Sequence, residues 1–337
     1  MPGANHIQIE SGTVEASECA SRHAGGFAHT IGRRPTMEDE MILGEEIGNN
    51  LHVWAVLDGH GGRFSVERLI KAIPEALKAR LAADGGEELS PEAITEAIEK
   101  VDQQLCEEAR KVDCEDGATC TMIVTNGNQK LMCVAQIGDS QVVRCGAFGA
   151  EELCSQHRTD SEPELKRLES VGAEVVDDRV KGRRRSIAVT RALGDVDIKD
   201  STKGLIATAE VTEELLSASD ELLIIGCDGL WDVMGAEDAW ELAKRKGRKG
   251  PKEWDVAKVA RELVQAAYEL NSGDNISVLV LALRPKRKLR ATAGAAALHI
   301  GKPDAAAAAG KNKLKPADVS ITVGANGQVQ GVRLVDK

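Results

Sequence analysis

The chain has 337 residues, 42% of them hydrophobic and 2% aromatic, which allows a sizeable aliphatic core in one large domain or two ordinary ones. The formal net charge of −11 argues against a general nucleic-acid binder and suits a carboxylate-rich site that bound cations partly neutralise. The eight cysteines include no C-x-x-C pair, and with no signal peptide and no apolar run of about 18 residues we expect a cytoplasmic protein without a membrane span.

Charged residues gather close to the N-terminus. Residues 1–21 are polar and are predicted to form an arm, and the segment 32–40 then places Arg33 and Arg34 near three acids. Arginine can bind two phosphate oxygens at once, whereas carboxylates suit hard cations. Taken alone, this segment is best interpreted as a surface loop with offsetting charges.

The next segment is a strand that ends in an acid. Five apolar residues, 53–57, predict a buried strand, and Asp58-Gly59-His60-Gly61-Gly62 follows directly. An unpaired buried carboxylate is costly, and glycines let the backbone approach another group closely. The segment fits a metal site, with the Gly59 carbonyl as a ligand and His60 placed for proton transfer, as well as it fits a turn with a solvated Asp58.

Hydrophobic periodicity predicts most of the remaining elements. Apolar residues at helical spacing predict helices over 66–81, 90–105, 163–171, 239–244 and 254–270. Apolar runs bounded by turn residues predict strands over 121–125, 131–137, 141–145, 222–227 and 276–283. The basic segment 179–185 is interpreted as a solvated loop, with the binding of a phosphorylated partner as the alternative.

At Arg284 the composition changes. A basic stretch leads into Ala-, Gly- and Lys-rich sequence, and the segments 319–323 and 329–335 then predict a small hairpin. Within the basic stretch, residues 286–290 are interpreted as a solvated linker, with a nuclear-import signal as the alternative. We therefore divide the chain into an N-terminal arm, a main domain and a tail, at 1–21, 22–284 and 285–337.

The decisive pattern is a recurrence of acids at strand ends. Asp58, Asp139, Asp228 and Asp274 each adjoin an apolar strand and stand next to Gly or Asn. A mixed or antiparallel sheet can bring such ends to one edge, where four carboxylates would repel one another unless cations lie among them. Oxygen ligands, no cysteine and one nearby histidine favour Mg²⁺ or Mn²⁺ over zinc.

These residue types suit the hydrolysis of a phosphate ester. Two hard cations would generate hydroxide from a shared water and neutralise phosphoryl oxygens, Arg34 would hold the phosphate, and His60 would protonate the leaving oxygen. A cysteine-based phosphatase is excluded because no cysteine has an arginine six positions later. Asp195-Val196-Asp197 resembles an aspartyl-phosphate motif, but no apolar strand leads directly into it. H-E-x-x-H and P-loop motifs do not occur.

Seven motifs follow one another along the chain: Arg34-Pro35-Thr36-Met37-Glu38-Asp39, Asp58-Gly59-His60-Gly61-Gly62, Gly117-Ala118-Thr119, Gly138-Asp139-Ser140, Thr190-Arg191-Ala192-Leu193-Gly194-Asp195, Asp228-Gly229-Leu230-Trp231-Asp232 and Asp274-Asn275. In this order they resemble the motifs of the metal-dependent serine/threonine protein phosphatases of type 2C, the PPM family. The resemblance covers residues 22–284. Each motif is weak by itself, and their order makes the resemblance specific.

The resemblance implies an α+β fold, a four-layer α-β-β-α sandwich of two antiparallel sheets flanked by helices, with the metal site at one edge. It implies the dephosphorylation of phosphoserine and phosphothreonine in protein substrates by a hydroxide generated at a binuclear Mg²⁺ or Mn²⁺ centre. Arg34 resembles the phosphate-binding arginine and His60 the general acid. A monomer that binds neither nucleic acid nor membrane is expected.

The resemblance also implies a ligand set. Asp58 resembles the carboxylate that bridges two metals, and Gly59 the residue that offers a carbonyl. Glu38 resembles a ligand of the second metal, and Asp228 and Asp274 those of the first. Asp139 and Asp232 resemble the carboxylates of a weaker third site.

The sequence departs from the family pattern at Gln141, where many relatives carry Arg, at Ala209, where Pro is frequent, and in the triple arginine 183–185. None of these positions is an expected metal ligand, so we expect activity and place the differences in substrate preference and flap geometry. Two alternatives are a pseudo-enzyme with a regulatory role and a two-metal hydrolase of small phosphate esters or nucleotides. The intact carboxylates argue against the first, and the scarcity of aromatic residues against nucleotides.

Overall fold

The computed structural model describes residues 7–15, 23–85, 89–126, 131–250 and 253–283, and the backbone of two further strands, 318–323 and 329–335. The chain forms two compact units, Met1–Lys286 and Arg287–Lys337. In the second unit, β20 (Asp318–Val323) pairs antiparallel with β21 (Val329–Val335). Most of the predicted arm 1–21 and the predicted linker lie outside the described residues.

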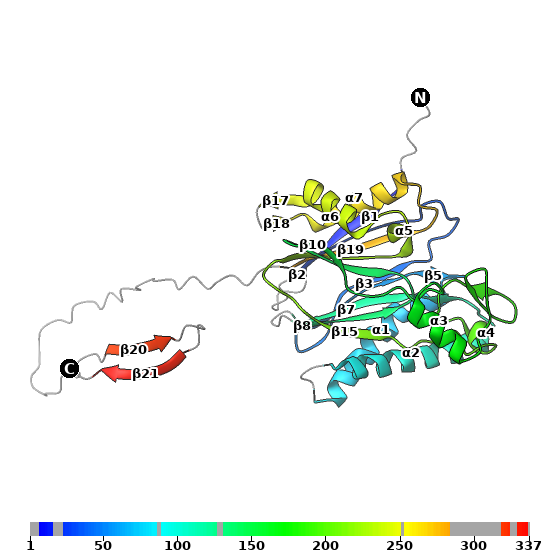
Figure 1. Ribbon diagram of the computed structural model, residues 1–337, viewed down its shortest axis with the longest axis horizontal. Coiled ribbons are helices and arrows are strands. Elements are labelled where there is room, and N and C mark those ends of the chain that lie inside the picture. The colour runs from blue at the N-terminus through cyan, green and yellow to red at the C-terminus, as the bar shows by residue number, and fades with distance from the viewer. Residues whose placement is uncertain are drawn as a thin grey trace, which may run out of the picture. The chain divides into compact units, whose positions relative to one another are not determined.

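Two antiparallel sheets form the centre of the first unit (Figure 1). The six-stranded sheet has the order β1 (Glu10–Glu15), β2 (His23–Thr30), β19 (Ile276–Leu283), β16 (Asp220–Gly226), β9 (Gln141–Gly146) and β10 (Gly149–Glu152). The five-stranded sheet has the order β15 (Glu210–Leu215), β8 (Leu131–Ile137), β7 (Cys120–Asn126), β4 (Leu51–Leu57) and β3 (Glu40–Gly48). All neighbouring strands in both sheets are antiparallel.

Helices cover the outer faces of the two sheets. The helices α1 (Phe64–Ala83) and α2 (Pro91–Val112) share one hydrophobic cluster with the five-stranded sheet. The helices α6 (Ala236–Gly247) and α7 (Val256–Glu269) share another with the six-stranded sheet. The predicted four-layer α-β-β-α fold is therefore confirmed, with the expected helix 90–105 extended by two turns.

The central strand β4 is covered on both faces, so its sequence does not alternate between apolar and polar residues. Val53, Ala55 and Leu57 pack in the cluster under α1 and α2, whereas Trp54 and Val56 pack in the cluster between the two sheets. Side chains of a strand point to opposite faces in turn, so a strand that is covered on both faces is apolar throughout.

A smaller region carries its own hydrophobic cluster. It contains α3 (Glu162–Ser170) and the sheet formed by β11 (Val175–Val176), β12 (Arg179–Lys181) and β13 (Ser186–Ile187). The expectation of a loop over 179–185 is wrong for its first three residues, because Val180 is fully buried and pairs with Ile187. The arginines 183–185 lie in the turn between β12 and β13.

Several short elements were not predicted. The strands β5 (Gly59–His60), β6 (Gly117–Ala118) and β14 (Leu193–Gly194) form a three-stranded sheet. Further unpredicted short elements include α4 (Val196–Lys199), α5 (Asp228–Trp231), β17 (Arg248–Gly250) and β18 (Glu253–Trp254). In the part of the chain that the structure describes, no helix is long and apolar enough to cross a membrane.

Candidate metal centre

The ends of strands from both sheets bring the predicted acids together. Asp58 follows β4 and Asp228 follows β16, whereas Asp139 lies between β8 and β9 and Asp274 lies just before β19. Burial raises the pKa of Asp58 well above its ordinary value, and the charges of Asp228, Asp139 and Asp274 raise it further. All four predicted strand-end carboxylates therefore contribute to one electrostatic cluster.

A fifth carboxylate, that of Asp39, belongs to the same cluster. Its side chain is buried, and its Oδ2 has no hydrogen-bond partner within the described part of the chain. Burial is the main cause that raises the pKa of Asp39 to about 7, and burial followed by the charge of Asp139 does the same for Asp228. Bound cations would relieve this repulsion and supply the missing partner, so the residues present fit hard divalent ions.

The expected ligand set contains no cysteine, but Cys227 lies beside the acidic cluster. Its Sγ lies within 4.8 Å of ligand atoms of Asp58 and Asp228. The thiol donates to the Asn275 carbonyl over 3.5 Å, and Sγ accepts from the Ser277 N–H over 3.2 Å. Burial raises the pKa of the Cys227 thiol well above its ordinary value. A neutral thiol is a poor metal ligand, so the carboxylates remain the better donors.

Glu38 and Gly59 lie against each other at the start of β3 and β5. A Cβ on Gly59 would lie 2.2 Å from the backbone oxygen of Glu38, so only glycine fits. The Glu38 N–H donates to Asn275 Oδ1 over 2.9 Å, and the Asn275 amide donates to the carbonyls of Ile31 and Thr36 over 2.9 Å each. Asn275 thus ties the segment that carries Arg34 and Glu38 to the beginning of β19, a role that the sequence did not reveal.

The two adjacent arginines have different environments. Arg33 donates to the Ser272 carbonyl over 2.5 Å, and its guanidinium lies 4.2 Å from the ring centroid of Tyr268. The Arg34 side chain is 54% exposed and donates from Nη2 to Asp274 Oδ2 over 2.6 Å. Arg33 therefore anchors the loop to the end of α7, and Arg34 lies at the solvent-accessible rim of the acidic cluster.

A buried carboxylate holds His60. His60 Nε2 lies 2.9 Å from both Asp195 oxygens, and the Asp195 side chain is fully buried. Burial alone would lower the pKa of His60, but the charge of Asp195 and its hydrogen bond raise it. Arg185 donates from Nη2 to Asp195 Oδ1 and to Asp197 Oδ1, each over 2.7 Å. Asp195 was examined in the sequence only as a nucleophile, so its role as partner of His60 was missed.

The last member of the site, Arg158, was not predicted at all. Its Nε donates to Asp139 Oδ2 and its Nη2 to Asp232 Oδ1, each over 2.8 Å. The same Nη2 lies 4.0 Å from Asp228 Oδ2. Arg158 lies 19 residues after Asp139 in the sequence, and no sequence pattern indicated that the two side chains meet.

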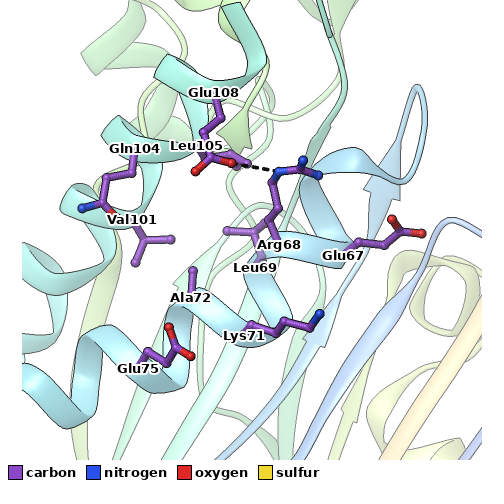
Figure 2. Close-up of a pocket in the computed structure, with 10 residues that line it drawn as sticks. All are labelled: Glu67, Arg68, Leu69, Lys71, Ala72, Glu75, Val101, Gln104, Leu105 and Glu108. Carbon is purple, nitrogen blue, oxygen red and sulfur yellow. Dashed lines mark hydrogen bonds and ion pairs between the residues drawn. The ribbon is translucent and has the colours of Figure 1, made fainter. Parts of the chain in front are cut away.

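A separate cavity of about 430 Å³ lies between α1 and α2 (Figure 2). An ion pair of 2.9 Å between Arg68 Nε and Glu108 Oε2 spans it. None of the predicted site residues lines this cavity, so it plays no part in the candidate metal centre.

Comparison with known proteins agrees with this geometry. The family model described as "Protein phosphatase 2C" matches residues 24–276. A relative named "Probable protein phosphatase 2C 68", from Oryza sativa subsp. japonica, is 33% identical over 293 residues, which cover 79% of each chain. A crystal structure of a serine-threonine phosphatase 2C from Toxoplasma gondii has the same fold, with a TM-score of 0.66 at 18% identity, covering 81% of this chain and 99% of the other.

The two antiparallel sheets flanked by helices have the fold of the solved protein phosphatase 2C structure, with a cluster of acids at the ends of their strands. The chain belongs to the protein phosphatase 2C family. It spans only part of some relatives: "Protein kinase and PP2C-like domain-containing protein" from Arabidopsis thaliana is 30% identical over 267 residues, which are 77% of this chain and 39% of that protein.

Proposed function

We propose that this chain is a protein serine/threonine phosphatase that uses two Mg²⁺ or Mn²⁺ ions to hydrolyse phosphoserine and phosphothreonine. The observation that supports this most strongly is the cluster of Asp58, Asp139, Asp228 and Asp274, with the unpartnered Asp39 Oδ2 beside it. Such a cluster needs cations and suits the neutralisation of phosphoryl oxygens.

The proposed ligands follow the positions of the acids. Asp58 would bridge the two ions, with the Gly59 carbonyl and Glu38 at one and with Asp228 and Asp274 at the other. A weaker third ion would lie between Asp139 and Asp232. When bound, the ions would lower the pKa of water and stabilise charge on the phosphate.

Two side chains of the rim would act on the substrate. Arg34 is half-exposed and makes one ion pair, with Asp274. Once metal ions neutralise that acid, the guanidinium of Arg34 would be available to bind two phosphate oxygens. His60 Nε2 is held by Asp195, which leaves Nδ1 as the nitrogen that can give a proton to the leaving oxygen. Asp195 would keep the imidazole oriented and favour its protonated form.

The test is the release of phosphate from a phosphothreonine peptide with Mn²⁺ present. We expect turnover by the wild-type chain and a loss of at least a hundredfold in Asp228→Asn. The control is Asp200→Asn, because Asp200 also carries an ion pair, with Arg110, but lies on the surface. Failure of the wild type to turn over in Mn²⁺ or Mg²⁺ would favour the pseudo-enzyme.

The choice of substrate distinguishes the proposed protein phosphatase from the other alternative, a hydrolase of small phosphate esters. Hydrolysis of p-nitrophenyl phosphate without hydrolysis of the phosphopeptide would favour an enzyme for small phosphate esters. Phosphorylated proteins as partners, the monomeric state and the cytoplasmic or nuclear location of the chain remain predictions.

A further inference from the structure

Arg158 connects the acidic cluster to the smaller region of the fold. It lies between β10 and α3, and its backbone forms an isolated antiparallel bridge with Val189. Its carbonyl accepts from the Ser161 N–H over 3.1 Å, just ahead of α3. The neighbouring His157 N–H donates to the Gly138 carbonyl over 2.9 Å. The backbone of residues 157 and 158 therefore connects the segment that carries Asp139 to the smaller region.

The head of Arg158 occupies the space between two carboxylates. It contacts Asp139 through Nε and Asp232 through Nη2, each at 2.8 Å. The Asp139 side chain is 6% exposed, whereas that of Asp232 is 51% exposed. A cation that approaches from solvent can reach Asp232 freely, but Arg158 already holds the inner carboxylate.

The same two carboxylates are those proposed for the weak third ion. A guanidinium and a divalent ion repel each other strongly at contact distance, and Arg158 already holds one oxygen of each carboxylate. The pair therefore cannot hold both cations in the geometry observed. Asp58 and Asp39 have no arginine partner within the described residues. Asp274 pairs with Arg34, but the Asp139–Asp232 pair is bridged by a single guanidinium, that of Arg158.

We propose that the guanidinium of Arg158 occupies the cation position between Asp139 and Asp232, and that a third metal ion must displace this guanidinium in order to bind there. This inference rests on the proposed function, because it assumes that metal ions bind to the cluster and that a third ion binds between Asp139 and Asp232. Arg158 is then a positioning residue. While its guanidinium is in place, it neutralises the two carboxylates and holds the smaller region against the site. When the third ion binds, the contacts of Arg158 with Asp139 and Asp232 are released. This competition would account for the weakness that the family resemblance implies for the third site.

Counting bound Mn²⁺ tests the proposal without using activity. Titration followed by electron paramagnetic resonance of free Mn²⁺ separates tight from weak binding. In Arg158→Gln we expect the weak ion to bind at least tenfold more tightly, with the tight ions unchanged. Adding Asp139→Asn to that variant should abolish the gain. The matched control is Arg144→Gln, because Arg144 also contacts two carboxylates, Glu151 and Glu214, yet should leave Mn²⁺ binding unchanged.

A second measurement uses the wild-type chain and does not depend on the folding of a variant. Hydrogen exchange of peptides covering residues 157–161 should accelerate at Mn²⁺ concentrations that fill the weak site. An unchanged or weaker third ion in folded Arg158→Gln, or exchange that does not respond to Mn²⁺, would overturn the proposal. If the wild type binds no Mn²⁺ at all, the proposed function itself fails, which is a distinct result.

Discussion

Glu164 of α3 is a buried carboxylate whose loss should destabilise the region next to the site. It is 3% exposed and accepts from Arg191, Arg167 and Thr190, with Arg191 Nη2 at 2.5 Å, Arg167 Nη2 at 2.8 Å and Thr190 Oγ1 at 2.6 Å. Burial alone would raise the pKa of Glu164, but the hydrogen bonds from Arg191 and Arg167 lead the causes that lower it to about 2. Thr190 and Arg191 begin the segment that ends at Asp195, so this carboxylate also supports the partner of His60.

The magnitude follows from linkage between ionisation and folding. Lowering the pKa of Glu164 from 4.5 to about 2 corresponds to about 3 kcal/mol of stability at neutral pH, since one pKa unit is about 1.4 kcal/mol. Because the pKa in the folded state is the lower one, this contribution is fully present above about pH 4.5 and is lost as the pH falls toward about 2.

Urea unfolding of Glu164→Gln at pH 7 and at low pH measures this contribution. We expect the variant to lose about 3 kcal/mol at pH 7 and less than half of that at pH 3. The control is Glu162→Gln, because Glu162 pairs with Lys166 on the surface and should cost less than about 0.5 kcal/mol. A loss below about 1 kcal/mol at pH 7, or one that does not shrink at low pH, would refute the assigned role of the ion pairs.

Three further predictions concern the site. Asp195→Asn should lower kcat for a phosphothreonine peptide by about tenfold to a hundredfold. The loss of kcat for p-nitrophenyl phosphate should be smaller, because nitrophenolate leaves without a proton. Equal losses for the two substrates would contradict the role of His60 as the acid. Arg34→Ala should raise KM for the phosphopeptide about tenfold or more, since a charge-assisted bond to phosphate is lost, and an unchanged KM and kcat would remove Arg34 from the site. Gly59→Ala places a Cβ 2.2 Å from the Glu38 carbonyl oxygen, so calorimetry should show weakened Mn²⁺ binding, and binding of wild-type strength would refute the close approach.

The sequence predicted those parts of the site whose pattern is local. A strand that is covered on both faces is a continuous apolar run, so the end of β4 and the acid behind it could be recognised directly. Asp58, Asp228 and Asp274 share this signature. The helical and extended periods within each segment also predicted most helices and the most apolar strands, whereas the four-layer arrangement was implied by the family resemblance.

The missed residues depend on contacts between distant segments. Asp195 meets His60 across 135 positions and Asn275 meets Glu38 across 237. Two-residue strands such as β5 and β14 carry no periodicity, so neither they nor the contact that they create could be predicted. Cys227 packs in the hydrophobic cluster between the two sheets and at the same time lies beside Asp58 and Asp228.

The distribution of arginines over the acids indicates where metal ions bind first. Arg34 contacts Asp274, and Arg158 contacts Asp139 and Asp232, so each of these carboxylates has a positive partner in the protein. Within the described residues, Asp39 and Asp58 have no such partner. Burial and neighbouring acids raise the pKa of Asp58 most clearly, so a cation gains most at this carboxylate. The tight ions should therefore bind around Asp58, whereas the acids with arginine partners bind ions only as those arginines move aside.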